Sequence, residues 1–169
     1  MPTIATVGVY EFDAAGFIRT LDAAGVTRVI DIRQRRGVRG PQYAWANAQR
    51  LQARLADAHI GYEHRPELAP TTELRQLQYR EDDRQGVGKR SRLRLSPEYI
   101  RAYTEEILDR VPLEPLVDDL PVHGIAALLC VEQTAAACHR SLVAQRLSER
   151  FGFEVVHLEP SEPMDVDLL

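Results

Sequence analysis

Lysine is nearly absent from this sequence, since Lys89 is the only one among 169 residues while arginine occurs throughout. Long apolar runs are missing as well, and no stretch approaches the ~18 residues of a membrane span. The N-terminus shows no basic segment leading into a long apolar core, so we expect no secretory signal. These absences predict a cytoplasmic protein that makes no use of a membrane.

Cysteine is also scarce, with Cys130 and Cys138 the only two in the chain. Two cysteines are too few for a disulfide framework, so we expect thiols, thiolates or ligands in a reducing compartment. Apolar residues make up 44% and charged residues 27% of the chain, which excludes wholesale disorder. A length of 169 residues fits one globular domain.

The net charge of −4 excludes a globally basic protein, but positive charge is concentrated in two segments. Residues 28–54 contain seven arginines and a single acid, and residues 75–101 contain seven arginines and Lys89 against four acids. A GC-rich genome would favour arginine over lysine, but it would not explain this clustering. The excess of acidic over basic residues lies in the last third of the chain.

Strand and helix patterns alternate along the chain. Apolar, β-branched runs predict strands at 4–9, 26–32, 60–62, 125–131 and 153–158, and helical spacing predicts helices at 13–24, 43–59, 96–110 and 135–151. This order predicts a single three-layer α/β domain over residues 1–160 with a mainly parallel, roughly five-stranded, Rossmann-like sheet. We expect an irregular insert at 66–96, mostly loop with a short helix at 72–79, and a flexible acidic tail at 161–169.

Open parallel sheets place their functional crevice at the carboxyl ends of the strands. The residues at these ends of the predicted strands are Gly8, Tyr10, Asp31, Arg33, His64, Cys130, Glu132 and His157. Asp31 and Arg33 are two residues apart, so their side chains point the same way in an extended segment. They form either a structural ion pair or a site in which Arg33 orients an anion and Asp31 moves a proton.

The most specific pattern is Cys-x-Glu followed by Cys-His-Arg, from Cys130 to Arg140. We expect its second half in the first turns of the helix at 135–151, whose N-terminus favours an anion or a thiolate. Successive helical residues point about 100° apart. Cys138 is therefore expected to be buried, and His139 and Arg140 to reach the crevice.

Four interpretations of this pattern remain open. Metal ligation by Cys130, Glu132, Cys138 or His139 is chemically possible, but the spacing matches no usual zinc motif, so we predict no metal and keep the two cysteines as weaker candidates. A thiol-transfer or phosphatase-like site conflicts with Glu132, which would raise the pKa of Cys130. Simple packing and charge pairing is the third interpretation. Acid–base work by Glu132 or His139, with arginines clamping a phosphate or carboxylate, fits best.

The loop after the second strand carries Arg35, Arg36 and Arg39, with Tyr43 and Trp45 nearby as stacking surfaces. A second basic run occupies residues 89–94. Solvated charged loops are one interpretation of both. If both segments fold over the same crevice, nucleic acid becomes a candidate partner.

Four motifs resemble those of the family known as domain of unknown function 488. They are Thr6-Val7-Gly8, Asp31-Ile32-Arg33, Tyr62-Glu63-His64, and the pattern from Cys130 to Arg140, and together they span nearly the whole chain. Two segments depart from the family pattern: Val9-Tyr10 replaces a hydroxyl-bearing strand end, and an arginine-rich loop replaces a proline-serine segment. The resemblance implies the fold and the grouping of site residues, and it implies no activity.

The sequence thus predicts an enzyme that acts on an anionic substrate, namely a phosphate-bearing compound, a nucleotide or a nucleic acid. It indicates no particular cofactor. The alternatives are a non-catalytic nucleic-acid-binding module and a metal-binding protein. The expected catalytic residues are Asp31, Glu132 and His139. The expected substrate-binding residues are Gly8, Arg33, His64 and Arg140, and the expected nucleic-acid contacts are Arg35, Arg36 and Arg39.

Overall fold

A computed structural model describes residues 2–160 and contains one five-stranded sheet. All neighbouring strands are parallel, in the order β3-β2-β4-β1-β5. The strands are β1 (Thr3–Val7), β2 (Val26–Asp31), β3 (Gly61–His64), β4 (Ile125–Leu129) and β5 (Glu154–His157). The predicted α/β class and strand number are confirmed. The acidic tail predicted at 161–169 lies outside the described residues.

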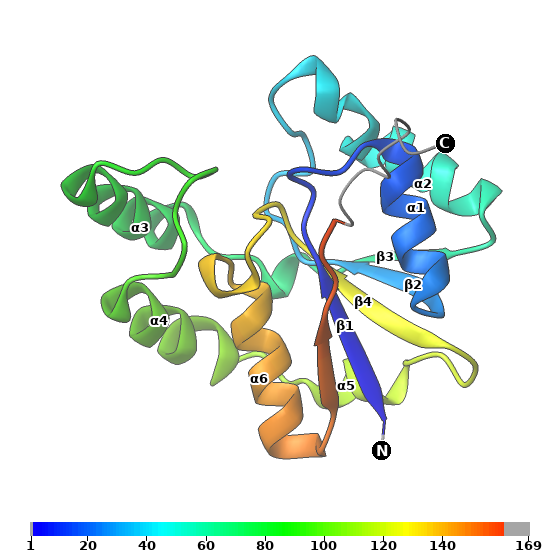
Figure 1. Cartoon of the computed structure of the whole chain (residues 1–169). Helices are drawn as coiled ribbons and strands as arrows, with labels where there is room; N and C mark the ends of the chain where they lie inside the picture. The colour runs from blue at the N-terminus through cyan, green and yellow to red at the C-terminus, as the bar shows by residue number, and fades with distance from the viewer. Residues whose placement is uncertain (1, 161–169) are drawn as a thin grey trace, which may run out of the picture.

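Helices cover both faces of the sheet, as Figure 1 shows. On one face, α1 (Ala14–Ala23) and α2 (Ala48–Asp57) bury Phe17 and Leu51 in a core with alternate strand residues. On the other face, α4 (Pro97–Tyr103), α5 (Glu114–Asp118) and α6 (Arg140–Phe151) form a second core. Two cores sharing one sheet make three layers and explain why the strands are apolar on both sides. Within residues 2–160, no helix has both the length and the apolarity to cross a bilayer.

The predicted insert is far more helical than the sequence suggested. Its helix α3 runs over Thr72–Gln85, where only a short helix at 72–79 was expected. Thr71 caps it by accepting from the backbone N–H of Leu74, and Gly86 ends it in the left-handed conformation that glycine favours. The helix is almost entirely polar, so it carries little apolar periodicity to predict it from. Helices α3 and α4, with a π-helical continuation over Thr104–Leu108, form a helical arm beside the sheet (Figure 1).

Two other predicted helices begin later than expected. The helix at 43–59 is a 3₁₀ segment, Pro41–Ala46, separated from α2 by an extended Asn47. The helix at 135–151 is likewise a 3₁₀ turn, Ala135–Ala137, followed by an extended Cys138 before α6 begins. The predicted helix is confirmed over Arg140–Phe151, whereas the expectation that Cys138 and His139 follow its helical spacing is wrong, and this break shapes the site.

Candidate functional site

A cavity of about 730 Å³ opens at the carboxyl ends of β2 and β4. Its walls come from the loop after β2, the helical arm with its connecting segment, and the loop after β4. Among the described residues that line it, only Glu132 is acidic, whereas seven are cationic: Arg33, Arg35, Arg39, Arg75, Lys89, Arg90 and Arg92. Segments far apart in the chain thus meet at one rim of the sheet, and the cavity they enclose is strongly positive.

Asp31 and Arg33 form a buried ion pair at the end of β2. The Arg33 Nε and Nη2 atoms donate to the two carboxylate oxygens of Asp31 at 2.9 and 2.8 Å, and Nη1 donates to the carbonyl of Ala46 at 2.9 Å. Burial would lower the pKa of Arg33, but the hydrogen bond and charge of Asp31 outweigh it and raise that pKa. Asp31 is fully buried and does not line the cavity. The pair therefore holds the end of β2 in shape.

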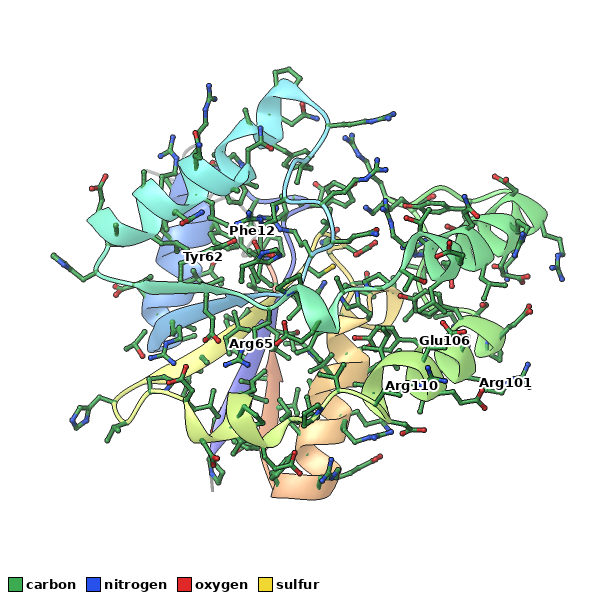
Figure 2. The ribbon with its side chains drawn as sticks, turned by 180° about the vertical axis from the view of Figure 1, so that it is seen from behind. Phe12, Tyr62, Arg65, Arg101, Glu106 and Arg110 are labelled. Atoms are coloured by element: carbon green, nitrogen blue, oxygen red, sulfur yellow. The ribbon has the colours of Figure 1, made fainter. Side chains whose placement is uncertain are left out.

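Strand β3 braces this pair. The hydroxyl of Tyr62 donates to Asp31 Oδ2 at 2.6 Å, and the Nε2 atom of His64 lies 3.1 Å from the carbonyl oxygen of Arg33. Figure 2 labels Tyr62 where β3 runs beside the neighbouring strands. His64 is not among the residues that line the cavity. The Tyr-x-His motif thus supports the site from the side.

Arg140 has a comparable supporting position. It is fully buried, its Nε donates to Thr6 Oγ1, and its Nη atoms donate to the carbonyls of Glu132 and Gln133. Gly8 leaves the necessary space, because a Cβ there would overlap the Glu132 carbonyl oxygen. Arg140 does not line the cavity. Its guanidinium holds the loop after β4 in place and does not reach the cavity.

Cys130, Cys138 and His139 meet at the cavity floor, and we call them the Cys–His cluster. The Nε2 atom of His139 lies 2.9 Å from the carbonyl oxygen of Ile32, a contact that requires an N–H at Nε2. Nδ1 therefore faces the two sulfurs, 3.5 Å from Cys130 Sγ and 3.8 Å from Cys138 Sγ. The extended backbone at Cys138 is what turns its thiol toward Cys130.

The two thiols of the cluster have opposite acidities. Burial raises the pKa of Cys130 well above its ordinary value. Burial acts in the same direction on Cys138, but the hydrogen bond from Cys130 and the charge of His139 outweigh it, so the pKa of Cys138 lies well below its ordinary value. For His139, burial lowers the pKa and the negative charge of Cys138 raises it, with a net rise. Cys138 is thus the more acidic thiol of the cluster.

Glu132 lies beside the cluster and is tied to the helical arm. Its Oε1 accepts from Arg92 Nη2 at 2.7 Å, and its Oε2 lies 3.7 Å from Cys130 Sγ. Burial raises the pKa of Glu132, and the charges of Lys89 and Arg92 act against that rise. Arg92 also donates to Asp82 at 2.6 Å and to the carbonyl of Ala137 at 3.1 Å. One arginine therefore joins α3 to the cavity floor.

Lys89 and Arg92 lie in the basic run at 89–94, but neither was among the site residues expected from the sequence. Lys89 makes no hydrogen bond or ion pair with any residue between 2 and 160, and its half-buried side chain lines the cavity. Burial lowers its pKa, but the negative charge of Glu132 outweighs that effect and raises it. The signal in the sequence was its rarity, since it is the one lysine in a chain that otherwise uses arginine.

The two arginine-rich segments do fold over the same cavity. Arg90 donates to the carbonyl of Arg39 at 3.2 Å, and its guanidinium lies 5.1 Å from the ring centre of Tyr10. Arg35 and Arg39 line the cavity, whereas Arg36 turns away and donates to the hydroxyl of Tyr62.

The aromatic residues near the cavity differ from those the sequence suggested. Trp45, expected as a stacking surface, is buried in the core against Phe17, with ring centres 4.9 Å apart. Tyr43 is also buried. The aromatic side chains that line the cavity are Tyr10, Tyr79 and Tyr99.

Comparison with known proteins agrees with the resemblance noted in the sequence. No curated protein and no solved structure matches the chain. A family model described as "Domain of unknown function DUF488" matches residues 13–147, which include β2, β3, β4 and the Cys–His cluster. Because that match covers most of the chain, the protein belongs to the domain of unknown function DUF488 family.

Proposed function

We propose that the protein is an enzyme that acts on a phosphate-bearing small molecule of nucleotide size, bound in the cavity at the carboxyl edge of the sheet. The observation that carries this proposal is the lining of seven cationic side chains against a single carboxylate. Protein sites for small molecules typically enclose ~300–1,000 Å³, and the volume of about 730 Å³ lies within that range. An anion of several charges would balance the excess positive charge.

Lys89 and Arg90 are the proposed phosphate ligands. Lys89 has three donors and no partner among residues 2–160, and Arg90 lies over Tyr10 at the opening where the two arginine-rich segments meet. This assignment moves the anion-binding role away from Arg33 and Arg140, whose guanidinium nitrogens already donate to protein oxygens. The half-buried ring of Tyr79 offers a surface against which a planar group can stack.

Glu132 is the proposed acid–base group, because it is the one carboxylate among the described lining residues and lies beside the Cys–His cluster. His139 donates through Nε2 to Ile32 and presents Nδ1 to the cluster. Asp31 is screened from the cavity by its pairing with Arg33, so we assign it a positioning role.

The proposal is tested by titrating 5′-AMP and ADP into the protein and into a Lys89→Ala variant, with the affinity measured by calorimetry. A charge-assisted hydrogen bond contributes ~1.5–3 kcal/mol, so the variant should bind roughly ten- to a hundredfold more weakly. Arg101→Ala is the matched control, since it removes one positive charge from an exposed position on α4 that does not line the cavity (Figure 2). Equal binding by all three proteins would contradict the proposal.

The same titration with single-stranded oligonucleotides separates an enzyme for small substrates from a nucleic-acid-binding module. A module should bind longer strands more tightly, with a steep loss of affinity on adding salt. An enclosed site for one nucleotide unit should gain little from added length. The Arg36→Ala variant is a second means to distinguish the enzyme from the binding module. Arg36 turns toward Tyr62, so its loss should weaken binding only if a nucleic acid extends beyond the cavity.

A further inference from the structure

We propose that the Cys–His cluster is a metal site that binds one Zn²⁺ through Cys130 Sγ, Cys138 Sγ and His139 Nδ1, with a fourth position open to the cavity. These three atoms all lie within 4.8 Å of one another, and all three residues are buried. Two thiolates and an imidazole are a donor set that zinc prefers over magnesium or calcium. The inference does not depend on the phosphate-binding proposal.

The distances in the cluster fit a tetrahedral zinc ion. Zn–S and Zn–N bonds of ~2.3 and ~2.05 Å at the tetrahedral angle place a sulfur and a nitrogen ligand about 3.6 Å apart. Nδ1 of His139 lies 3.5 Å from Cys130 Sγ and 3.8 Å from Cys138 Sγ. Both nitrogen–sulfur separations thus match those of a zinc site, and the two sulfurs lie no more than 4.8 Å apart.

The surroundings of His139 match those of a metal-ligating histidine. Such histidines donate their other ring N–H to a carbonyl or a carboxylate, which fixes the tautomer and aims the ligating nitrogen. Here Nε2 is held at 2.9 Å from the carbonyl oxygen of Ile32, so the lone pair of neutral His139 is at Nδ1 and points at the sulfurs. Ile32 follows β2 directly, which anchors the ring to the sheet.

The spacing Cys-x7-Cys-His matches no usual zinc pattern because the three ligands come from two different elements. Cys130 follows the end of β4, whereas Cys138 and His139 immediately precede α6. The 3₁₀ turn and the extended Cys138 fold the intervening chain back, so that residues eight positions apart face each other. Sequence spacing alone therefore could not support a metal site here.

The fourth position faces the cavity. Cys130, Cys138 and His139 all line it, and Glu132, which is not one of the three cluster ligands, lies beside Cys130 with its Oε2 3.7 Å from that sulfur. Structural zinc sites use four protein ligands, whereas catalytic ones use three and leave a position for water or substrate. Three ligands and an adjacent carboxylate correspond to the second kind. An oxygen of a bound water or phosphate would complete the coordination.

The test uses the full-length protein, stripped with a chelator under reducing conditions and titrated with Co²⁺ as a spectroscopic substitute for Zn²⁺. The expected result is saturation at one equivalent, with a thiolate-to-cobalt charge-transfer band and the intense visible bands of tetrahedral cobalt. Zn²⁺ should displace the cobalt and abolish these bands. Cys138→Ser should lose roughly half of the charge-transfer intensity, because one of the two thiolate ligands remains, and should bind metal at least tenfold more weakly.

His123→Gln is the matched control, since His123 is an exposed histidine just before β4 that lies outside the cluster and the cavity, and this variant should bind cobalt as the unchanged protein does. Circular dichroism verifies that each variant is folded. If Cys138→Ser does not fold, the spectrum and stoichiometry of the unchanged protein decide the question. Absence of a charge-transfer band in the reduced protein, or cobalt binding unaffected by the cysteine substitution, would overturn the proposal in favour of a metal-free dithiol.

Discussion

The buried charges of this protein are each matched by a specific partner. Arg33 is 1% exposed and Arg140 is fully buried, and a buried guanidinium is tolerated only where its donors are satisfied. Arg33 uses the carboxylate of Asp31, whereas Arg140 uses backbone carbonyls and a threonine hydroxyl. These two arginines, which first suggested anion clamps, hold the strand ends that form the cavity.

This arrangement predicts a large stability effect at Asp31. Asp31→Asn removes the charge that compensates Arg33, and breaking a buried ion pair from one side costs about 3–5 kcal/mol of unfolding free energy. Asp109→Asn is the control, because Asp109 is half-exposed in its pair with Arg146 and such pairs contribute ~1 kcal/mol or less. Urea denaturation measures both. Comparable losses in the two variants would show that the Asp31–Arg33 pair is not a structural requirement.

At the level of residues, the sequence identified the motifs, but it did not show which of their side chains line the cavity and which only support it. The two-residue spacing of Asp31 and Arg33 at a strand end placed both side chains together, because a strand alternates its faces. Which arginines remain available to a ligand depends on carbonyls such as that of Ala46, which approach only after folding. The spacing of residues within one segment can be read directly from the sequence. The hydrogen-bond partners of a side chain cannot, because they come from segments that are distant in the sequence.

The helical arm is the element that closes the cavity. Arg92 lies in the segment between α3 and α4 and bridges Asp82 of α3 to Glu132 after β4. The backbone N–H of Leu95 donates to the carbonyl of Ala136, which adds a second attachment to the loop before α6. These contacts fix the connecting segment of the arm at the cavity, in addition to the apolar packing of α4 against the sheet.

Loss of Arg92 should loosen the arm and leave the sheet intact. In Arg92→Ala, amides in residues 86–96 should exchange with deuterium about tenfold faster or more, equivalent to ~1.4 kcal/mol of easier local opening. Peptides from β1 and β4 should keep their protection. Arg94→Ala, an exposed arginine two residues away, should exchange like the unchanged protein. Uniform acceleration across the sheet would mean that Arg92 contributes to global stability instead.

Elements were predictable where apolar periodicity was strong and not where it was weak. The strand at Ile125–Leu129 follows from an apolar run. The helix cap at Asp13 follows from its short carboxylate, which accepts from the backbone N–H of Gly16. Helix α3 is polar on nearly all sides and is stabilised by its contacts with α4, so its length could not be predicted. The extended conformation of Cys138 could not be predicted, because the alanine-rich stretch before it favours helix.

At the scale of the whole molecule, the positive charges are concentrated at the cavity although the net charge is negative. The chain carries a net charge of −4, yet the cavity gathers seven cationic residues around one carboxylate. The sequence could predict that the ends of β2 and β4 share a rim, because parallel strands present their carboxyl ends at the same edge. It could not predict that Lys89, in the insert, would reach the cavity, since that depends on how the helical arm packs.

The most direct test of the central claim, that this cavity binds phosphate, is a crystal structure of the protein grown with ADP. We predict density for the phosphates between Lys89 and Arg90, with the base against Tyr79 and the ion pair of Asp31 and Arg33 unchanged. Density for ADP only at another surface, with the cavity holding solvent at saturating ligand, would contradict the account.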